Sequence, residues 1–164
     1  MRSSLRWARR HPLGLTCLVT LLTLAGSPTP ASAQGGGGSG GSGGSGYKII
    51  INPASSMSVV SRKELAAVYL KKTAKWRDGT PAVPVDLSED APARSGFSRD
   101  VLGKPTQAVK AYWNQQIFSG RSAPPAEKRS DADVVAFVRS TPGAVGYVSA
   151  STPTPGVKLL AVRS

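Results

Sequence analysis

The sequence predicts an α/β domain with a mostly parallel sheet flanked by helices, and three observations support this. Apolar runs typical of buried strands recur at 47–52, 82–86, 144–149 and 157–162. Segments with apolar residues at helical spacing lie between the first three of these runs. Turns rich in Gly and Pro separate the two kinds of segment. Strands that alternate with helices are typical of a sheet with helices packed against it.

The first half of the domain contains a strand, a capped helix and a second strand. Residues 47–52, YKIIIN, suit a strand that is covered on both faces. After the loop PASSMS, Ser61 and Glu64 form a capping box, which predicts the start of a helix. Trp76 lies among lysines; we interpret it as covering the end of the core, the alternative being a surface on which a base or sugar stacks. Residues 82–86 are the second strand.

The second half contains three helices and two strands. A helix that carries Phe97 ends at Gly103, and the next helix begins near Thr106. Ser130 caps a further helix. The expected buried face of the helix after Thr106 consists of Val109, Tyr112, Trp113 and Ile117. Residues 144–149 and 157–162 are expected strands, and residues 49–51, 83–85 and 145–148 are expected to share one sheet.

The N-terminal residues carry targeting and linker patterns. Residues 1–33 combine four arginines, an apolar run of 14 residues and the small-residue motif Ala31-Ser32-Ala33, which is the order of a secretory signal peptide. A membrane anchor is the alternative, but a spanning helix needs about 20 apolar residues. Residues 34–46 are a Gly/Ser-rich flexible linker, either built or natural. We therefore expect a periplasmic or secreted protein with no stable membrane span after signal cleavage, and one domain at 47–164.

The residue types missing after the signal peptide exclude several chemistries. The only cysteine, Cys17, and the only histidine, His11, both lie within residues 1–33. Residues 34–164 therefore offer no disulfide, no Cys/His zinc site and no nucleophile activated by histidine. Spacing alone does not exclude a carboxylate pair of the kind that glycosidases use. We expect a protein that is not an enzyme and has no cofactor and no metal.

The charge favours anionic partners. The formal net charge is +12, and +8 remains when the four arginines of residues 1–33 are removed. Such a charge attracts phosphate, acidic polymers or a membrane surface, while a generally cationic and soluble surface is the simpler alternative. The basic residues are dispersed and no nucleic-acid-binding motif is present, so we expect no nucleic acid partner.

The candidate binding site is formed by loops that follow strands and lead into helices. The first N–H groups of a helix lack partners, and with hydroxyls and a guanidinium they can bind an anion. The candidate anion ligands are Ser55, Ser56, Ser88, Arg94 and Ser95. We expect the two loops that carry them to converge, although an ordinary turn is the alternative for the first loop. Glu89 and Asp90 lie in the second loop, where their charge opposes an anion.

Three segments resemble phosphate-type solute-binding proteins of ABC importers. They are ELAAVYLKKTAKWRDGTPAVPVD, AYWNQQIFSG and TPGAVGYVS, and the resemblance covers nearly all of residues 47–162. It implies a single lobe of a type II periplasmic-binding-protein fold. Full-length relatives hold the ligand between two lobes and use an arginine and a Ser-Gly-Thr tripeptide before a helix. With Phe97 as the anchor, the tripeptide falls on Ala91-Pro92-Ala93 and the arginine near Leu87, so no ligand residue carries over by matching.

The resemblance implies one of two functions. The first is an exported, phosphate-type solute-binding module that binds phosphate or a similar oxyanion weakly and is linked to ABC transport through a transporter or partner protein. The second is a non-enzymatic structural or protein-interaction module that has lost ligand binding. Retained hydroxyls favour the first function, and the lost tripeptide favours the second.

Overall fold

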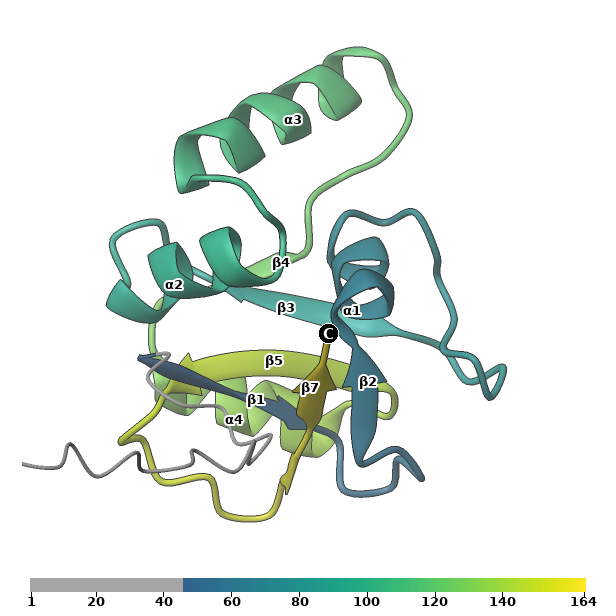
Figure 1. The fold of residues 1–164 in the computed structure, drawn as a ribbon, viewed down its shortest axis with the longest axis vertical. Coiled ribbons are helices and arrows are strands. Elements are labelled where there is room, and N and C mark those ends of the chain that lie inside the picture. The colour runs from purple at the N-terminus through teal and green to yellow at the C-terminus, as the bar shows by residue number, and fades with distance from the viewer. Residues whose placement is uncertain (1–45) are drawn as a thin grey trace, which may run out of the picture. The chain divides into compact units, whose positions relative to one another are not determined.

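The computed structural model describes residues 46–164, which belong to one compact unit, Gly38–Ser164. The predicted signal peptide and most of the predicted linker lie outside the described residues. Residues 46–164 form seven strands and four helices (Figure 1). These are β1 (Tyr47–Ile51), β2 (Val59–Ser61), α1 (Arg62–Tyr69), β3 (Val83–Leu87), α2 (Pro92–Asp100), α3 (Thr106–Phe118), β4 (Ala126–Lys128), α4 (Asp131–Ser140), β5 (Ala144–Ser149), β6 (Lys158–Leu159) and β7 (Ala161–Arg163).

The main sheet has the strand order β4-β3-β5-β1-β6. Strand β3 pairs in parallel with β4 and β5, whereas β1 runs antiparallel to its neighbours β5 and β6. The expected α/β class with parallel central strands is therefore confirmed, and residues 49–51, 83–85 and 145–148 do share one sheet. A second, two-stranded parallel sheet pairs β2 with β7.

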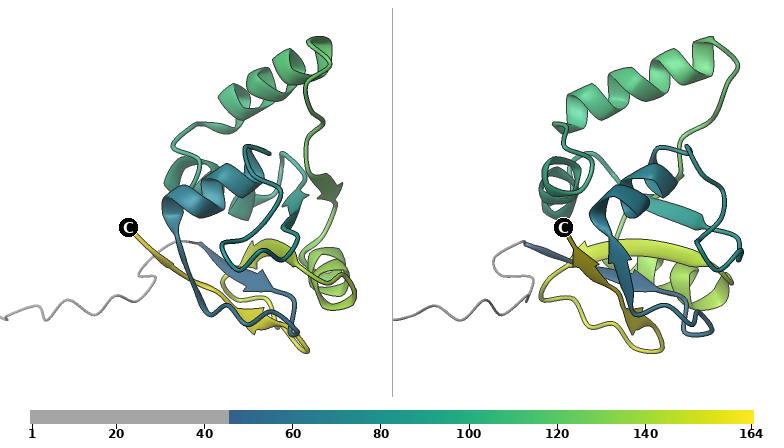
Figure 2. Two further views of the ribbon diagram at one scale, coloured as in Figure 1. Left: turned by 90° about the vertical axis from the view of Figure 1, so that its right-hand side faces the viewer. Right: turned by 45° about the vertical axis from the view of Figure 1, so that its right-hand side comes forward.

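The helices are arranged in layers around the main sheet. Helices α1 and α2 cover one face and α4 covers the other, so the central strands are buried on both sides (Figure 1). Gly146 at the centre of β5 allows α4 to approach, because a Cβ there would lie 2.6 Å from Cγ1 of Val134. Helix α3 packs beyond α1 and α2, on their side away from the sheet (Figure 2).

The C-terminal segment corrects one sequence prediction. Residues 157–162 were expected to form one strand, but the chain changes sheets at Leu160. The N–H of Leu160 donates to the carbonyl of Ile49 in β1 (3.0 Å), and the next N–H, of Ala161, donates to Ser58 (2.9 Å), just before β2. An apolar run that is continuous in sequence therefore supplies two short strands. The short strands β2 and β4 were not predicted.

Most expected core positions are buried, with one clear exception. Val109 and Trp113 of α3 are buried and Tyr112 is half-buried, but Ile117 is 52% exposed, so its expected place on the buried face was wrong. The helix ends one residue later, and its last turn extends past the elements beneath it. Trp76 is buried and its indole N–H donates to the carbonyl of Gly143 (3.4 Å), which confirms that it covers the end of the core.

The helix caps follow the predicted chemistry in part. The hydroxyls of Ser61 and Ser130 accept N–H bonds from Glu64 and Asp133, each at 3.2 Å. The carboxylate of Glu64 pairs with Arg77 at 2.5 Å, so only the first half of the capping box forms. Among the described residues, no helix is long and apolar enough to cross a bilayer.

Candidate functional site

The structure places the two halves of the predicted site at opposite ends of the main sheet. Because β1 is antiparallel to β5, and β3 is parallel to β5, the C-terminal ends of β1 and β3 point in opposite directions. Ser55 and Ser56 follow β1, and Ser88 follows β3, so the expected convergence of their loops was wrong. The sequence predicted a mostly parallel sheet and did not indicate that β1 is one of its antiparallel strands.

The first loop makes ordinary turn contacts. The hydroxyl of Ser55 accepts the N–H of Met57 (3.2 Å), and its carbonyl accepts a bond from the ammonium of Lys158 (2.7 Å). The hydroxyl of Ser56 donates to the carboxylate of Asp78 (3.2 Å). The hydroxyl of Ser56 therefore has its proton engaged, and the hydroxyl of Ser55 is held in place as an acceptor.

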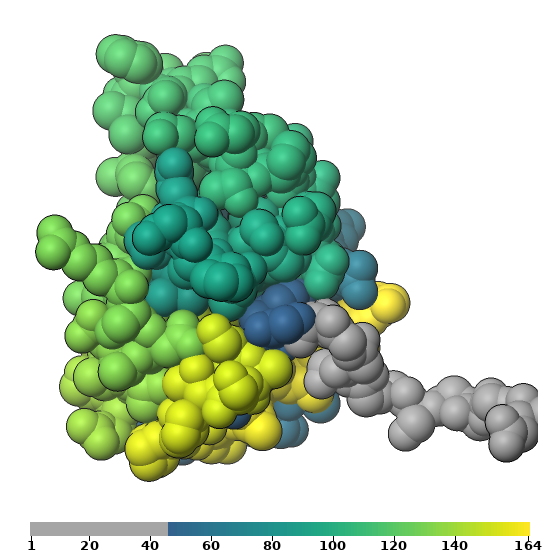
Figure 3. Space-filling view, turned by 90° about the vertical axis from the view of Figure 1, so that its left-hand side faces the viewer, coloured from purple at the N-terminus to yellow at the C-terminus, as the bar shows by residue number. Residues whose placement is uncertain are grey.

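The second loop lies between β3 and α2, at the end of the sheet shown in Figure 3. Its Ser88 donates from the backbone to the carbonyl of Lys128 (3.0 Å), and its hydroxyl bonds to Asp90, which lowers the pKa of that carboxyl. Glu89 pairs with Lys110 of α3 at 3.1 Å, with both side chains largely exposed. The loop therefore carries two carboxylates, and the one on Glu89 has a cation beside it.

The first turn of α2 has few N–H groups left for a ligand. Pro92 has no N–H, while the N–H groups of Ala91 and Arg94 donate to the carbonyls of Ser88 (3.1 Å) and Ala91 (2.9 Å). The hydroxyl of Ser95 donates to the carbonyl of Pro92 at 3.4 Å, a long bond that a ligand can replace. The remaining N–H of this turn belongs to Ala93, which is buried at 1% exposure, so the donor set left at the end of the helix is small.

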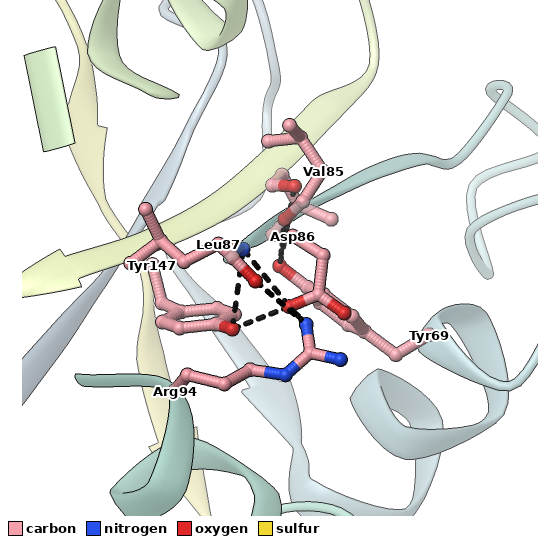
Figure 4. A network of polar contacts seen from close by, with 7 residues as sticks. Tyr69, Val85, Asp86, Leu87, Arg94 and Tyr147 are labelled. Atoms are coloured by element: carbon pink, nitrogen blue, oxygen red, sulfur yellow. Dashed lines mark hydrogen bonds and ion pairs between the residues drawn. The ribbon is translucent and has the colours of Figure 1, made fainter. Parts of the chain in front are cut away.

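The sequence predicted that Arg94 would be open to the loop as an anion ligand. The structure instead buries it, at 6% exposure. Its guanidinium forms an ion pair with Asp86, the penultimate residue of β3, and Nη1 also donates to the carbonyl of Leu87 (3.0 Å). Figure 4 shows the guanidinium directed at the end of β3. The arginine among the predicted ligands is therefore engaged by the domain itself.

Tyrosine hydroxyls complete a buried polar network around this ion pair (Figure 4). Tyr147 of β5 donates to the carboxylate of Asp86, and Tyr69 of α1 donates to the carbonyls of Val85 (3.0 Å) and Val145 (3.3 Å). Burial raises the pKa of both tyrosines, so both hydroxyls stay protonated as donors. The network joins α1, α2, β3 and β5.

Burial also governs the acid in the network. Desolvation raises the pKa of Asp86, while the charge of Arg94 and the hydrogen bond from Tyr147 oppose that rise. The pKa of Arg94 is shifted upwards: burial is the largest single influence and acts to lower it, but the charges of and hydrogen bonds to Asp86 and Tyr147 together outweigh it. The arrangement stabilises a charge pair inside the domain and leaves no acid or base facing solvent.

Sequence reasoning missed Asp86 and Tyr147. Asp86 was assigned to the second strand, and a carboxylate that ends a buried strand needs a buried partner. Arg94, eight residues later on the next helix, is within reach of that carboxylate once the loop turns back. This requirement could have indicated the pair, whereas the contribution of Tyr147 depends on strand order, which the sequence does not show.

A hollow of about 420 Å³ lies between β4 and α4. It is lined by Glu127, Lys128, Arg129, Asp133, Ala136, Phe137 and Ser140. The two carboxylates and two cations balance, so the hollow has no single sign of charge to attract an ion. Within residues 46–164 no group of three His, Cys, Asp or Glu side chains is placed to hold a metal ion.

Solved structures with a similar fold are phosphate-transport proteins. A protein of Clostridium perfringens assigned as a phosphate ABC transporter substrate-binding protein, with bound phosphate, matches at a TM-score of 0.56 and 16% identity. An ABC-type phosphate transport receptor of Vibrio cholerae matches at 0.55 and 17%, and PstS of Borrelia burgdorferi at 0.55 and 12%. No family model and no curated protein matches the sequence.

These matches define the class of fold. They cover 71%, 71% and 73% of this chain but only 44%, 46% and 47% of the respective structures, so the chain spans less than half the length of each. The described domain therefore has the fold of one part of a phosphate-type substrate-binding protein, as the resemblance implied. At such identities the similarity concerns the fold alone.

Proposed function

We propose that the domain is a single-lobe, non-enzymatic solute-binding module of an exported protein, which binds phosphate or a similar oxyanion weakly. The fold, the net charge of +8 on residues 34–164 and the donors at the start of α2 support oxyanion binding. We expect the binding to be weak because the ion pair with Asp86 engages Arg94, the strongest of the predicted anion ligands.

The proposed contact is the N-terminal end of α2. It combines the hydroxyls of Ser88 and Ser95, which would have to turn from the carboxylate of Asp90 and the carbonyl of Pro92 to the ligand, beside the carboxylate of Glu89. A single lobe leaves such a ligand open to water, which screens each charged hydrogen bond. We expect a dissociation constant in the high micromolar range or worse, which corresponds to roughly 4–6 kcal/mol. Transfer to an ABC transporter or a partner lobe is the step that such a module serves.

The second candidate is a structural or protein-interaction module that has lost ligand binding. The observation that favours it is the occupied first turn of α2, where Pro92 has no N–H and the N–H groups of Ala91 and Arg94 have internal acceptors. This candidate keeps the fold and the export of the first and differs only in having no affinity for oxyanions.

Calorimetric titration of inorganic phosphate distinguishes the two candidates. Ser88→Ala with Ser95→Ala removes both hydroxyls proposed to contact the anion, and Ser55→Ala with Ser56→Ala removes two hydroxyls at the other end of the sheet. We expect weak binding that the first pair reduces several-fold and the second pair leaves unchanged. Equal effects of the two pairs would mean that the attraction is only the diffuse positive charge, and no heat at millimolar phosphate would favour the second candidate.

A further inference from the structure

The C-terminal end of α3 presents two adjacent apolar side chains to solvent. Phe118 is 91% exposed and Ile117 is 52% exposed, and they are the last two residues of the helix. Single exposed apolar residues are common on protein surfaces, but an exposed pair at the end of a protruding element is a feature of contact sites. We call Ile117 and Phe118 the α3 tip.

The α3 tip is held in a fixed position. Gly120 has a φ of 64°, its N–H donates to the carbonyl of Ile117 (3.0 Å), and the N–H of Arg121 donates to Gln116 (3.0 Å). This pair of bonds is a Schellman motif, which closes the helix and orients the residues around it. The hydroxyl of Ser119 adds a bond to the carbonyl of Gln115 (2.8 Å). Phe118 is therefore displayed by a capped helix end and not by a loose loop.

Cations lie at the base of the α3 tip. Helix α1 also ends in a Schellman motif, with Lys71 at a φ of 53° and bonds from Lys71 to Val68 (3.0 Å) and from Lys72 to Ala67 (2.9 Å). The hydroxyl of Tyr112 in α3 donates to the carbonyl of Leu70 (3.0 Å), so this helix end adjoins the second half of α3.

Lys71 and Lys72 are exposed, and so is Arg121 beside the tip; we call these three residues the cationic collar. None of them forms an ion pair within residues 46–164. Residues 101–125, which include all of α3, contain no Asp or Glu, and the acidic side chain that pairs with α3 is Glu89, at Lys110, two turns before the tip. The partner of this surface must therefore combine negative charge with a place for two apolar side chains.

From these features we propose that the α3 tip and the cationic collar dock the domain on an anionic lipid surface. Helix α3 is the outermost helix of the described domain (Figure 2), a position from which its end can reach a soft interfacial layer. Apolar side chains enter the headgroup boundary while lysine and arginine attract anionic headgroups. A second copy of the chain is disfavoured, because two domains with a net charge of +8 repel one another. The proposal is independent of the proposed oxyanion site.

The test is sedimentation of the chain from Gln34 to Ser164, which contains the whole described core, with lipid vesicles. Vesicles of phosphatidylcholine alone are compared with vesicles in which about a third of the lipid is phosphatidylglycerol. We expect reversible binding to the anionic vesicles only, and weaker binding as salt rises, because the attraction of exposed charges is screened. No binding to the anionic vesicles would overturn the proposal and leave an acidic protein groove as the partner to be sought.

Matched variants show whether the α3 tip is responsible. Ile117→Ser with Phe118→Ser removes the tip, and the control Val59→Ser with Leu159→Ser removes two apolar residues that are 44% and 60% exposed elsewhere. We expect the tip variant to lose at least about five-fold in binding, because the interfacial contact scales with buried apolar area. The control should keep the affinity of the wild type. An unchanged tip variant would refute the proposal.

A second pair of variants separates the cationic collar from general charge. Lys71→Asn, Lys72→Gln and Arg121→Gln together neutralise the collar, with asparagine chosen because it tolerates a positive φ. The control removes three exposed charges elsewhere, with Arg62→Gln, Lys63→Gln and Arg163→Gln. We expect only the collar variant to lose most of its binding. Equal losses would show that diffuse charge, and not this surface, attracts the vesicles.

Discussion

The guanidinium of Arg94 in α2 pairs with the carboxylate of Asp86 in β3, and both side chains are buried. The pair links β3 to α2 on the buried side of the loop between them. Because its guanidinium is engaged by Asp86, Arg94 does not bind a ligand, which explains the weak anion binding expected here. The same ion pair is expected to stabilise this end of the domain. The neighbouring rings of Phe97 and Tyr147 stack at 4.0 Å between centroids and cover the pair with apolar surface.

Removing one member of this pair should be costly. We predict that Arg94→Ala lowers the free energy of unfolding by about 3–5 kcal/mol near neutral pH, because it leaves a buried carboxylate without its counter-charge. Replacing both members by apolar residues of similar size, with Asp86→Leu and Arg94→Met, should cost much less than the single change. Chemical denaturation of the three proteins measures this. A double variant that is less stable than Arg94→Ala would contradict the account.

The cost of Arg94→Ala should depend on pH. Burial raises the pKa of Asp86 above its ordinary 3.8, and the charge of Arg94 is the largest influence that opposes the rise. A carboxyl with a raised folded pKa contributes stability that is fully present below its unfolded pKa and is lost as the pH rises through the folded pKa. Without Arg94 the folded pKa of Asp86 is higher still, and the stability lost as the pH rises is larger.

We therefore predict that the stability gap between wild type and Arg94→Ala is small below the unfolded pKa and widens toward neutral pH. Denaturation at several pH values checks the sign. A gap that narrows as the pH rises would mean that Asp86 is stabilised in its charged form by other groups.

Trp113 should anchor α3 to the domain. Its side chain is buried at 6% exposure and meets Tyr112 edge-on, with ring centroids 5.0 Å apart. We predict that Trp113→Ala costs about 3–5 kcal/mol of unfolding free energy, the range for removal of a buried aromatic ring. Phe118→Ala, at the exposed tip of the same helix, should stay within about 0.5 kcal/mol of wild type. Similar losses for the two variants in thermal denaturation would show that the burial of α3 is misassigned.

Gly143 should tolerate substitution less well than other turn glycines. Its φ is 75°, and a Cβ there would lie 2.1 Å from the carbonyl oxygen of Pro81. Gly103 has a φ of 65° but no atom within 4 Å of the equivalent position. Both alanine variants bear the strain of a positive φ, about 1–2 kcal/mol, but only Gly143→Ala must also displace the backbone. We predict a distinctly lower melting temperature for Gly143→Ala, and equal melting temperatures would contradict the observed packing.

Much of the fold could be predicted because its signals are local. The isoleucines of β1 and the caps at Ser61 and Ser130 depend on residues close in sequence. The change of sheets at Leu160 could not be predicted, because nothing in that apolar run shows which strand each half will pair with.

The candidate site was harder to predict because it depends on long-range geometry. Ser56 and Ser88 have the same chemistry and both follow strands, and only the antiparallel direction of β1 separates them. Whether Arg94 faces a ligand or the core depends on Asp86, and that pairing needs the loop to fold back first. Local patterns predicted the helices and the main strands, but not the direction of β1, and the expected convergence of the two loops was therefore wrong.

The measurement that tests the central claim most directly is the phosphate affinity of the double variant Asp86→Leu with Arg94→Met, compared by calorimetry with that of wild type. The claim is that Arg94 serves the core and not a ligand. If so, the folded double variant should bind phosphate as weakly as wild type, with a dissociation constant in the high micromolar range or worse, which corresponds to roughly 4–6 kcal/mol. Sub-micromolar binding by wild type that disappears in a folded double variant would contradict it.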